Sequence, residues 1–313
     1  MRILLATDFS HYADIARALV KSLALPSGSE VRLVHAIEPV TTVAMFAPAA
    51  ITTLTEAAES EAKSEVKKIA KELDRPELNA DAVVGFGRAA DVVIDEAESF
   101  KPDLIVVGSR GRGGIATGVL GSVSAEIIDR ASCPVLVARR ETLSKVVLAE
   151  DGSAFAAAGG RALTGLPPFR GAEIRVVSVV DVPFPVVFAD PGATGTAVEA
   201  FRAYEEAMPK LRRQHATYAN ERAKSLVANG LSATAEQREG DAASEIIAAA
   251  REQNADCIVV GSRGQTGLRR LMLGSVARSV LFHAPCSVLV VHERTAPGAK
   301  QPEATTERIP AHA

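Results

Sequence analysis

A glycine-rich loop occurs twice in this chain, and its residues suit the binding of phosphate. Residues 103–111 read DLIVVGSRG and residues 256–264 read DCIVVGSRG, so eight of nine positions are identical. A Gly-Ser pair follows each loop at the same distance, which gives the pattern G-x2-G-x9-G-S twice. Glycines can take positive φ and let the backbone approach a ligand, and the amides at a helix start favour an anion. The sequence therefore predicts two phosphate-binding loops.

Side chains around these loops have both a binding role and a simpler alternative. Arg110 and Arg263 lie between the glycines, where they would offset phosphate charge or be solvated loop residues. Arg112 has no counterpart, because Gln265 takes its place in the second loop. Ser122 would add a hydroxyl to the anion site or act as a helix N-cap. A single loop is also typical of a plain glycine turn, but its recurrence favours a binding role.

The distance between the loops indicates two whole domains. The first glycines are 153 residues apart (261 − 108), and 313 residues at about 150 per domain also give two. We expect domains over residues 1–140 and 144–293, packed side by side because the linker between them is short. Residues 294–313 are rich in Pro, Thr and charge, and we expect a disordered tail there.

Short apolar runs alternate with stretches of helical period in both halves. Continuous apolar runs indicate parallel strands with helices on both faces, so we expect each half to be a five-stranded, doubly wound α/β domain. Amphipathic periods over residues 54–73 and 211–226 predict helices that pack on these sheets. The predicted strands span residues 3–7, 31–37, 82–84, 104–107, 135–138, 146–149, 174–180, 233–235, 257–260 and 288–291.

The composition argues against several classes of function. A net charge of −3 with 4% aromatic residues gives neither a basic surface nor stacking platforms, so we expect no nucleic-acid partner. No segment reaches the roughly 18 apolar residues of a membrane span, so we expect no membrane partner. Three cysteines are too few for a disulfide framework and favour a reducing cytoplasm. The histidines are scattered and give no metal-ligand spacing.

Four separated motifs occur in the same order in both halves. The first half contains Ala6-Thr-Asp-Phe-Ser10, the loop 103–111, Gly121-Ser-Val123 and Ser132-Cys-Pro-Val-Leu-Val137. The second contains Glu150-Asp-Gly-Ser153, the loop 256–264, Gly274-Ser-Val276 and Pro285-Cys-Ser-Val-Leu-Val290. Together these motifs resemble the universal stress protein family in a tandem, two-domain form. The resemblance covers nearly the whole chain apart from its tail.

The resemblance implies an ATP-binding domain of Rossmann-like topology in each half, with strand order 3-2-1-4-5. The residues implied at the ribose and the base are Asp8, Ala36 and Val107, with Asp151, Val179 and Val260. Those implied at the phosphates are Gly108, Gly111, Gly121, Ser122 and Val123, with Gly261, Gly264, Gly274, Ser275 and Val276. Arg110 and Arg263 join these nucleotide-binding residues on their own chemistry, as candidates to offset phosphate charge. On the residues alone, Asp8 would serve equally well as an N-cap of the next helix.

We expect an ATP-binding module that regulates a stress response and has no dedicated catalysis. The sequence leaves open whether magnesium is needed and which protein is the partner. We expect a homodimer, and two chains would associate through their last strands. Weak ATP hydrolysis remains an alternative, as does a carrier of flavin or another adenine cofactor on the same fold. A purely structural protein with vestigial loops is a further alternative.

Two further patterns invite other readings. Asp8, Ser10 and His35 would form a hydrolytic constellation, but the second half has serine at the position of the histidine and so lacks the base. Residues 85–90, GFGRAA, fit a dinucleotide fingerprint, yet they follow the third strand where that fingerprint belongs after the first. Both patterns therefore carry less weight than the repeated loops, which favour nucleotide binding.

The second half is longer than the first after its second strand. The first-strand motifs are 143 residues apart (151 − 8) and the loops 153, so ten residues are inserted between them. Residues 183–195 are rich in Pro and Gly and are the expected place. This segment would cover the edge of the sheet as a lid, or be a tolerated surface insertion. Pro134 is replaced by Ser287, which predicts a changed entry into the last strand.

Overall fold

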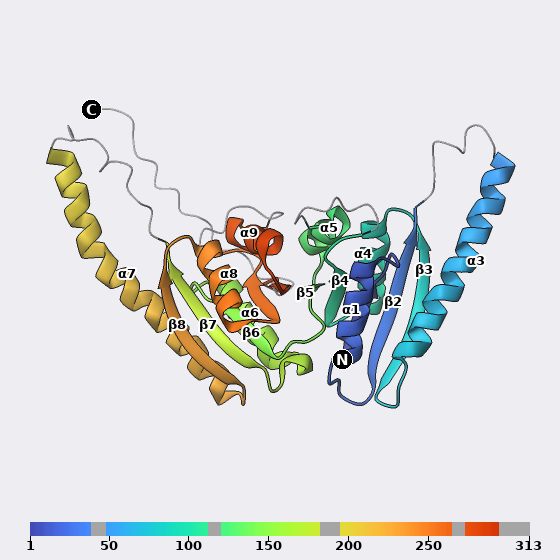
Figure 1. Ribbon diagram of the computed structural model, residues 1–313, viewed down its shortest axis with the longest axis horizontal. Coiled ribbons are helices and arrows are strands. Elements are labelled where there is room, and N and C mark those ends of the chain that lie inside the picture. The colour runs from blue at the N-terminus through green and yellow to red at the C-terminus, as the bar shows by residue number, and fades with distance from the viewer. Residues whose placement is uncertain (39–47, 112–119, 182–194, 265–272, 294–313) are drawn as a thin grey trace, which may run out of the picture.

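Figure 1 shows a computed structural model of the chain. It describes residues 1–38, 48–111, 120–181, 195–264 and 273–293. Among these residues, no helix combines the length and the apolar character that a membrane crossing would require.

Strands and helices alternate through both halves. The first half contains β1 (Arg2–Ala6), α1 (His11–Ser22), β2 (Ser29–Ile37), α3 (Pro48–Leu73), β3 (Leu78–Phe86), α4 (Ala89–Phe100), β4 (Leu104–Gly108), α5 (Ser122–Arg130) and β5 (Val135–Ala138). The second contains β6 (Lys145–Ala149), α6 (Ala154–Gly165), the 3-10 helix η1 (Pro167–Phe169), β7 (Glu173–Val180), α7 (Gly195–Ala228), β8 (Ser232–Glu239), α8 (Ala242–Gln253), β9 (Cys257–Gly261), α9 (Ser275–His283) and β10 (Ser287–Val291).

All ten strands belong to one sheet, in the order β3-β2-β1-β4-β5-β10-β9-β6-β7-β8. Within each half the neighbours are parallel and follow the predicted order 3-2-1-4-5, which is confirmed. The halves meet where β5 and β10 pair antiparallel, with Leu136 opposite Leu289. Both last strands are thus already paired within the chain, so the expectation that two chains associate through them is wrong.

Alternating side chains of the strands build two hydrophobic layers, one on each face of the sheet. Ile3 and Leu5 of β1 belong to a core that includes buried residues of α1, α3, α6 and α7. Leu4 points to the opposite face and belongs to a core that includes residues of α4, α5, α8 and α9. Each core runs through both halves, in agreement with the continuous sheet.

The outer strands and the long helices differ most from the sequence prediction. β3 and β8 are edge strands with many half-buried residues, so the apolar runs at 82–84 and 233–235 mark only part of each strand. Leu211, assigned to the apolar stripe of the second long helix, is 37% exposed. The stripe of α7 is instead built by Met208, Ala219, Ala223 and Leu226, all of them buried.

Two repeated acidic residues hold the strands at the end of the sheet away from the glycine loops. Asp103 accepts a hydrogen bond from the backbone N–H of Arg2 at 2.7 Å. Asp256 accepts hydrogen bonds from the N–H groups of Ser144 and Lys145 at 2.8 and 3.0 Å. The first residue of each repeated motif therefore fixes the start of the neighbouring central strand.

The linker between the halves is held by a residue that differs between the repeats. Ser287, which replaces the proline found at Pro134, is fully buried. Its Oγ accepts hydrogen bonds from the N–H groups of Arg139 and Arg140, each at 3.1 Å. The substitution noticed in the sequence thus anchors the segment that leaves β5.

Because both halves share one sheet, we expect a core substitution at their junction to destabilise the whole chain. Leu289 is fully buried in β10, and Leu289→Ala should lower the free energy of unfolding by about 2–5 kcal/mol. Urea unfolding followed by circular dichroism should still give one transition. Val227→Ala, at a position 54% exposed, is the control and should change stability by no more than about 0.5 kcal/mol. Two separate transitions, with only one shifted, would contradict a shared cooperative sheet.

Candidate functional site

A large cavity, the first-half cavity, opens where the carboxyl ends of β1, β2 and β4 meet. Its volume is about 1120 Å³, and α3 and the start of α5 complete its lining. This edge is where open parallel sheets bind their ligands. The structure brings together here all nine residues that the sequence analysis assigns to the first half: Asp8, Ala36, Val107, Gly108, Arg110, Gly111, Gly121, Ser122 and Val123.

Close contacts, and not positive φ, require the glycines of the loop. A Cβ added at Gly108 would lie 2.9 Å from the carbonyl carbon of Tyr12 in α1, where rigid backbone leaves no room. A Cβ added at Gly111 would lie 2.6 Å from Oδ2 of Asp8. Neither glycine has a positive φ, so that part of the expectation is wrong. Their missing side chains instead let α1 and Asp8 approach the loop.

The start of α5 is tied to the loop by hydrogen bonds. Gly121 donates its N–H to the carbonyl of Ser109 at 2.9 Å and is itself the N-cap residue, without a side-chain cap. Ser122 is therefore the first helical residue and not the N-cap, and it is exposed. The sequence analysis missed Ser124, which is buried and donates its Oγ hydrogen to the carbonyl of Gly108 at 2.8 Å. A polar residue on the inner side of this helix was the available signal.

Asp8 lies between the loop after β1 and the glycine loop. Its Oδ1 accepts a hydrogen bond from the N–H of Ser10 at 3.0 Å. Ser10 in turn caps α1, because its Oγ accepts the N–H of Ala13 at 3.3 Å. The alternative role of Asp8 as the N-cap is therefore wrong. The carboxylate instead braces the turn, with Oδ2 on the side of Gly111.

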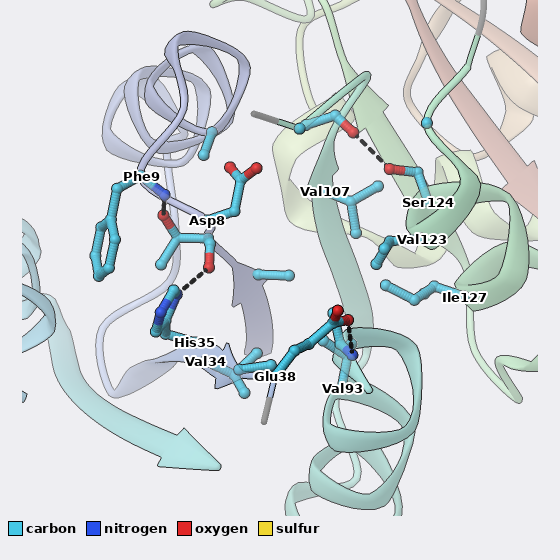
Figure 2. A pocket seen from close by; sticks show the side chains of 18 of the residues that line it. Asp8, Phe9, Val34, His35, Glu38, Val93, Val107, Val123, Ser124 and Ile127 are labelled. Atoms are coloured by element: carbon cyan, nitrogen blue, oxygen red, sulfur yellow. Dashed lines mark hydrogen bonds between the residues drawn. The ribbon is translucent and has the colours of Figure 1, made fainter. Parts of the chain in front are cut away.

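An aromatic pair forms one side of the cavity (Figure 2). The ring centroids of Phe9 and His35 are 4.3 Å apart, and Nδ1 of His35 is 2.8 Å from the carbonyl oxygen of Thr7. Phe9 has a φ of 60°, a strained value for a residue with a side chain. The histidine and the capping Ser10 thus have structural partners. This geometry gives no support to the hydrolytic constellation.

Across the cavity from this pair, Figure 2 shows an apolar side built from three different elements. Val107 is the next-to-last residue of β4, Val123 and Ile127 lie on α5, and Val93 lies on α4. Val34 of β2, beside His35, also lines the cavity. Val34, Val93 and Ile127 were not assigned from the sequence, because each looks like an ordinary core residue. An apolar side opposite a carboxylate and a glycine loop suits a ligand with a flat ring at one end and charge at the other.

Acidic side chains outnumber basic ones in the lining. The described lining residues include Asp8, Glu38, Glu61 and Glu65, against Arg110 as the basic residue. The guanidinium of Arg110 donates to the hydroxyl of Tyr12 at 3.0 Å and lies over its ring, 5.2 Å from the centroid. Among the described residues, no group of acidic, histidine or cysteine side chains is arranged to hold a metal ion.

The glycines of residues 85–90 serve packing. A Cβ added at Gly85 would lie 2.5 Å from a methyl carbon of Val92, so this glycine lets α4 approach β3. Glu38 accepts a hydrogen bond from the N–H of Ala89, the first residue of α4, at 3.0 Å. A carboxylate therefore already stands at the helix start where a dinucleotide would place its pyrophosphate. The geometry argues against a dinucleotide site here.

A comparison with known families identifies the two halves. The model of the universal stress protein family matches residues 1–139 and, a second time, residues 144–292. The chain belongs to the universal stress protein family. The last strands of the two matched segments are β5 and β10, and they pair with each other at the junction.

Individual relatives agree with this assignment. A universal stress protein of Mycobacterium bovis is 27% identical over 211 residues, which cover 62% of this chain and 63% of that protein. The chain thus spans less than two thirds of the length of this relative. A universal stress protein of Thermus aquaticus is 37% identical over 139 residues, covering 44% of this chain and 97% of that protein. The crystal structure of a universal stress protein from Archaeoglobus fulgidus has the same fold, with a TM-score of 0.60 at 18% identity, covering 93% of this chain and 98% of that one.

The second half of this universal stress protein repeats the loop geometry. A Cβ added at Gly264 would lie 2.8 Å from Oδ2 of Asp151, and one at Gly261 would lie 2.8 Å from the carbonyl carbon of Phe155. Asp151 braces the same turn, accepting the N–H of Ser153 at 2.9 Å. The remaining assigned residues lie at or just after the ends of β7 and β9, or at the start of α9: Val179, Val260, Arg263, Gly274, Ser275 and Val276.

A different element supplies the aromatic pair of the second half. Gly152 stands where the first half has Phe9 (9 + 143 = 152), and a Cβ added there would lie 2.5 Å from the ring of Tyr218 in α7. His215, also in α7, packs edge-on against Tyr218 with centroids 5.6 Å apart. Its Nδ1 is 2.9 Å from Oγ of Ser178 at the end of β7. The long helix thus replaces rings that the strand ends supply in the first half.

Several expectations fall on residues outside the described ranges. These are the Pro/Gly-rich insertion, apart from Gly195, which begins α7, and also Arg112, Gln265 and the tail 294–313. The lid, the role of Arg112 and the disorder of the tail therefore stay predictions.

The environment of His215 predicts a dependence of stability on pH. Burial lowers the pKa of His215 from its ordinary 6.5, and the charge of Asp151 offsets part of that shift. The unfolded chain therefore takes up a proton at a higher pH than the folded chain, so acidification below about 6.5 costs stability. We expect the fall in urea midpoint from about pH 7.5 to about pH 5.5 to be smaller in His215→Gln than in the wild type. His11→Gln, at an exposed position, should leave the fall unchanged. An equal fall in the wild type and in His215→Gln would refute this assignment.

Proposed function

We propose that this universal stress protein binds ATP in the first-half cavity and uses the occupancy as a regulatory signal. The observation that carries the proposal is that all nine assigned residues line one cavity of about 1120 Å³ at the carboxyl edge of the sheet. The duplicated glycine loop, with its close contact to Asp8, is the chemical feature that favours a nucleotide.

The cavity divides into parts that match the parts of the ligand. The base would lie on the apolar side, near Val107 and the backbone of Ala36. The ribose hydroxyls would donate to the carboxylate of Asp8, which already lies against the loop. The phosphates would accept hydrogen bonds from the amides of Gly108–Gly111 and from the start of α5 at Gly121, whose helix dipole favours negative charge.

We extend the proposal to the second half, where Asp151 and the loop 261–264 keep the same mutual contacts. His215 and Tyr218 of α7 would there take the place of the first aromatic pair. The two sites would thus bind the phosphates with the same loop and helix start, and would differ in the aromatic residues that line them.

The proposal includes no dedicated catalysis, because Ser10 and His35 are engaged as a helix cap and a strand-end contact. Weak ATP hydrolysis and the binding of flavin or another adenine cofactor are the alternatives. A protein partner and a homodimer belong to the proposal as well. Regulation would require the nucleotide to bind one of two conformations of the chain more tightly than the other. The glycine loop and the start of α5 would contact the nucleotide directly, so theirs is the conformation that binding would change.

Native mass spectrometry of the purified protein tests the identity of the ligand and its stoichiometry together. We expect ATP or another adenine nucleotide, and calorimetry with ATP should give two sites. A yellow, flavin-loaded protein would favour the cofactor carrier. Absence of any bound nucleotide, together with no heat on titration with ATP, would refute the proposal.

Gly111→Ala should weaken ATP binding at the first site about 10- to 100-fold. The new Cβ would lie 2.6 Å from Oδ2 of Asp8, so the carboxylate must turn away and lose a charged hydrogen bond of about 1.5–3 kcal/mol. Isothermal titration calorimetry measures the change. Gly165→Ala is the matched control, because a Cβ there meets nothing within 4 Å. Equal affinity of Gly111→Ala and the wild type would show that ATP does not use this loop.

The excess of carboxylates in the lining predicts that ATP enters with a cation. Among the described lining residues, four acidic side chains face one arginine. These carboxylates would repel a bare triphosphate, which is also negative. Because the described side chains form no metal site, magnesium would be carried on the phosphates. We expect ATP to bind at least about tenfold more weakly with EDTA than with magnesium. Affinity that is equal or higher in EDTA would contradict this account of the charge.

A further inference from the structure

A second cavity, here called the interdomain cavity, lies between the two halves. Its volume is about 570 Å³. The first half contributes Arg110 and Arg139 to the lining, and the second half contributes Arg251 of α8 and His283 of α9. Its described lining residues include no carboxylate. The cavity is therefore strongly cationic, in a chain whose net charge is −3.

Arg139 is the most buried of these basic groups, and its hydrogen bonds leave its charge uncompensated. Its two terminal nitrogens donate to the carbonyl oxygens of Cys286 at 3.2 Å and Leu281 at 2.5 Å. A guanidinium has five N–H donors, so others remain for a ligand. Among the described residues, no carboxylate oxygen lies within 4.0 Å of Arg139 or of Arg251.

The electrostatic surroundings of Arg139 are those of a site that lacks an anion. Burial lowers the pKa of the Arg139 guanidinium, Cys286 opposes this effect, and the like charge of Arg110 lowers the pKa further. The group nonetheless stays charged, because a guanidinium is not deprotonated in proteins. A negative ion between the arginines would relieve both the lost hydration and the repulsion.

The basic character of the interdomain cavity is not a by-product of the duplication. At the equivalent positions, 153 residues away, Arg139 corresponds to His292 and Arg251 to Glu98. The neighbouring Phe282 corresponds to an aspartate, Asp129 (282 − 153 = 129). The matching positions thus include two carboxylates, whereas this side has none in its described lining. The two halves therefore differ in charge at these matching positions.

The glycine loop of the first half separates the two cavities. Gly108 and Gly111 line the first-half cavity, Ser109 lines the interdomain cavity, and Arg110 lines both. The guanidinium of Arg110 lies over the ring of Tyr12, which also lines the interdomain cavity. An ion bound between the halves would therefore contact the back of the same loop.

We propose that the interdomain cavity binds a compact anion of the phosphate class, held by Arg110, Arg139 and Arg251. The anion is either free phosphate or pyrophosphate, or the phosphate end of a nucleotide. The site is distinct from the proposed ATP sites. Its place behind the glycine loop couples it to the first-half cavity.

Inorganic pyrophosphate is the probe, titrated into the full chain by calorimetry with and without saturating ATP. We expect one equivalent to bind without ATP, and the same equivalent to bind with saturating ATP if the site takes a free anion. Arg251→Glu introduces the charge found at the equivalent position of the other half, at an exposed residue, and should weaken this binding at least tenfold. Arg139→His, which copies His292, should do the same. Arg170→Glu, an exposed arginine outside the cavity, makes the same charge change and should alter affinity less than about twofold.

The outcomes separate the alternatives. If Arg251→Glu weakens pyrophosphate and leaves the ATP stoichiometry intact, the site takes a free anion. If it also removes one equivalent of ATP, the site takes a nucleotide tail. No binding of pyrophosphate by the wild type, binding that Arg251→Glu and Arg139→His leave unchanged, or an equal effect of Arg170→Glu would overturn the proposal. Failure of ATP alone to bind would refute the proposed function and leave this test intact.

Discussion

The close approach of helix α1 to the loop after β4 is the constraint on which the first-half cavity depends. Only a residue without a side chain fits at Gly108, because an added Cβ would lie 2.9 Å from the carbonyl carbon of Tyr12. This contact places the start of α1, and with it the turn that Asp8 braces, beside the glycine loop. The second half meets the same constraint at Gly261 and Phe155. Repetition of the loop in the sequence is thus first a packing requirement, and the lining of the first-half cavity is built on it.

Residues with local roles could be predicted from the sequence, and residues with partners far away in the chain could not. The glycine loops and the strands follow from spacing and from apolar runs, whereas the strand order and the role of Asp8 are what the family resemblance implies. Glu38 could not be assigned, because its partner is the first N–H of α4, at Ala89. Glu61 and Glu65 looked like the solvent face of an amphipathic helix, yet they line the cavity because α3 extends past the edge of the sheet.

The two halves show which features of a duplicated domain can change. The hydrogen bonds of Asp8 and Asp151 are the same, and so are the contacts of the loop glycines. The aromatic pair moved from the strand ends to α7, which the loss of a side chain at Gly152 made possible. Alignment of the repeats pairs Phe9 with Gly152 but does not locate the replacing ring, because Tyr218 lies 66 positions later (218 − 152).

The antiparallel pairing of β5 with β10 has a consequence for how this junction can evolve. In a dimer of identical chains the interface is isologous, so every mutation appears on both sides of the axis and must be tolerated twice. Covalent fusion removes that restriction. Ser287 can bind the linker amides while its counterpart remains a proline. A tandem chain is therefore free to acquire a one-sided feature at its own midline, which no symmetric pair of single domains could encode.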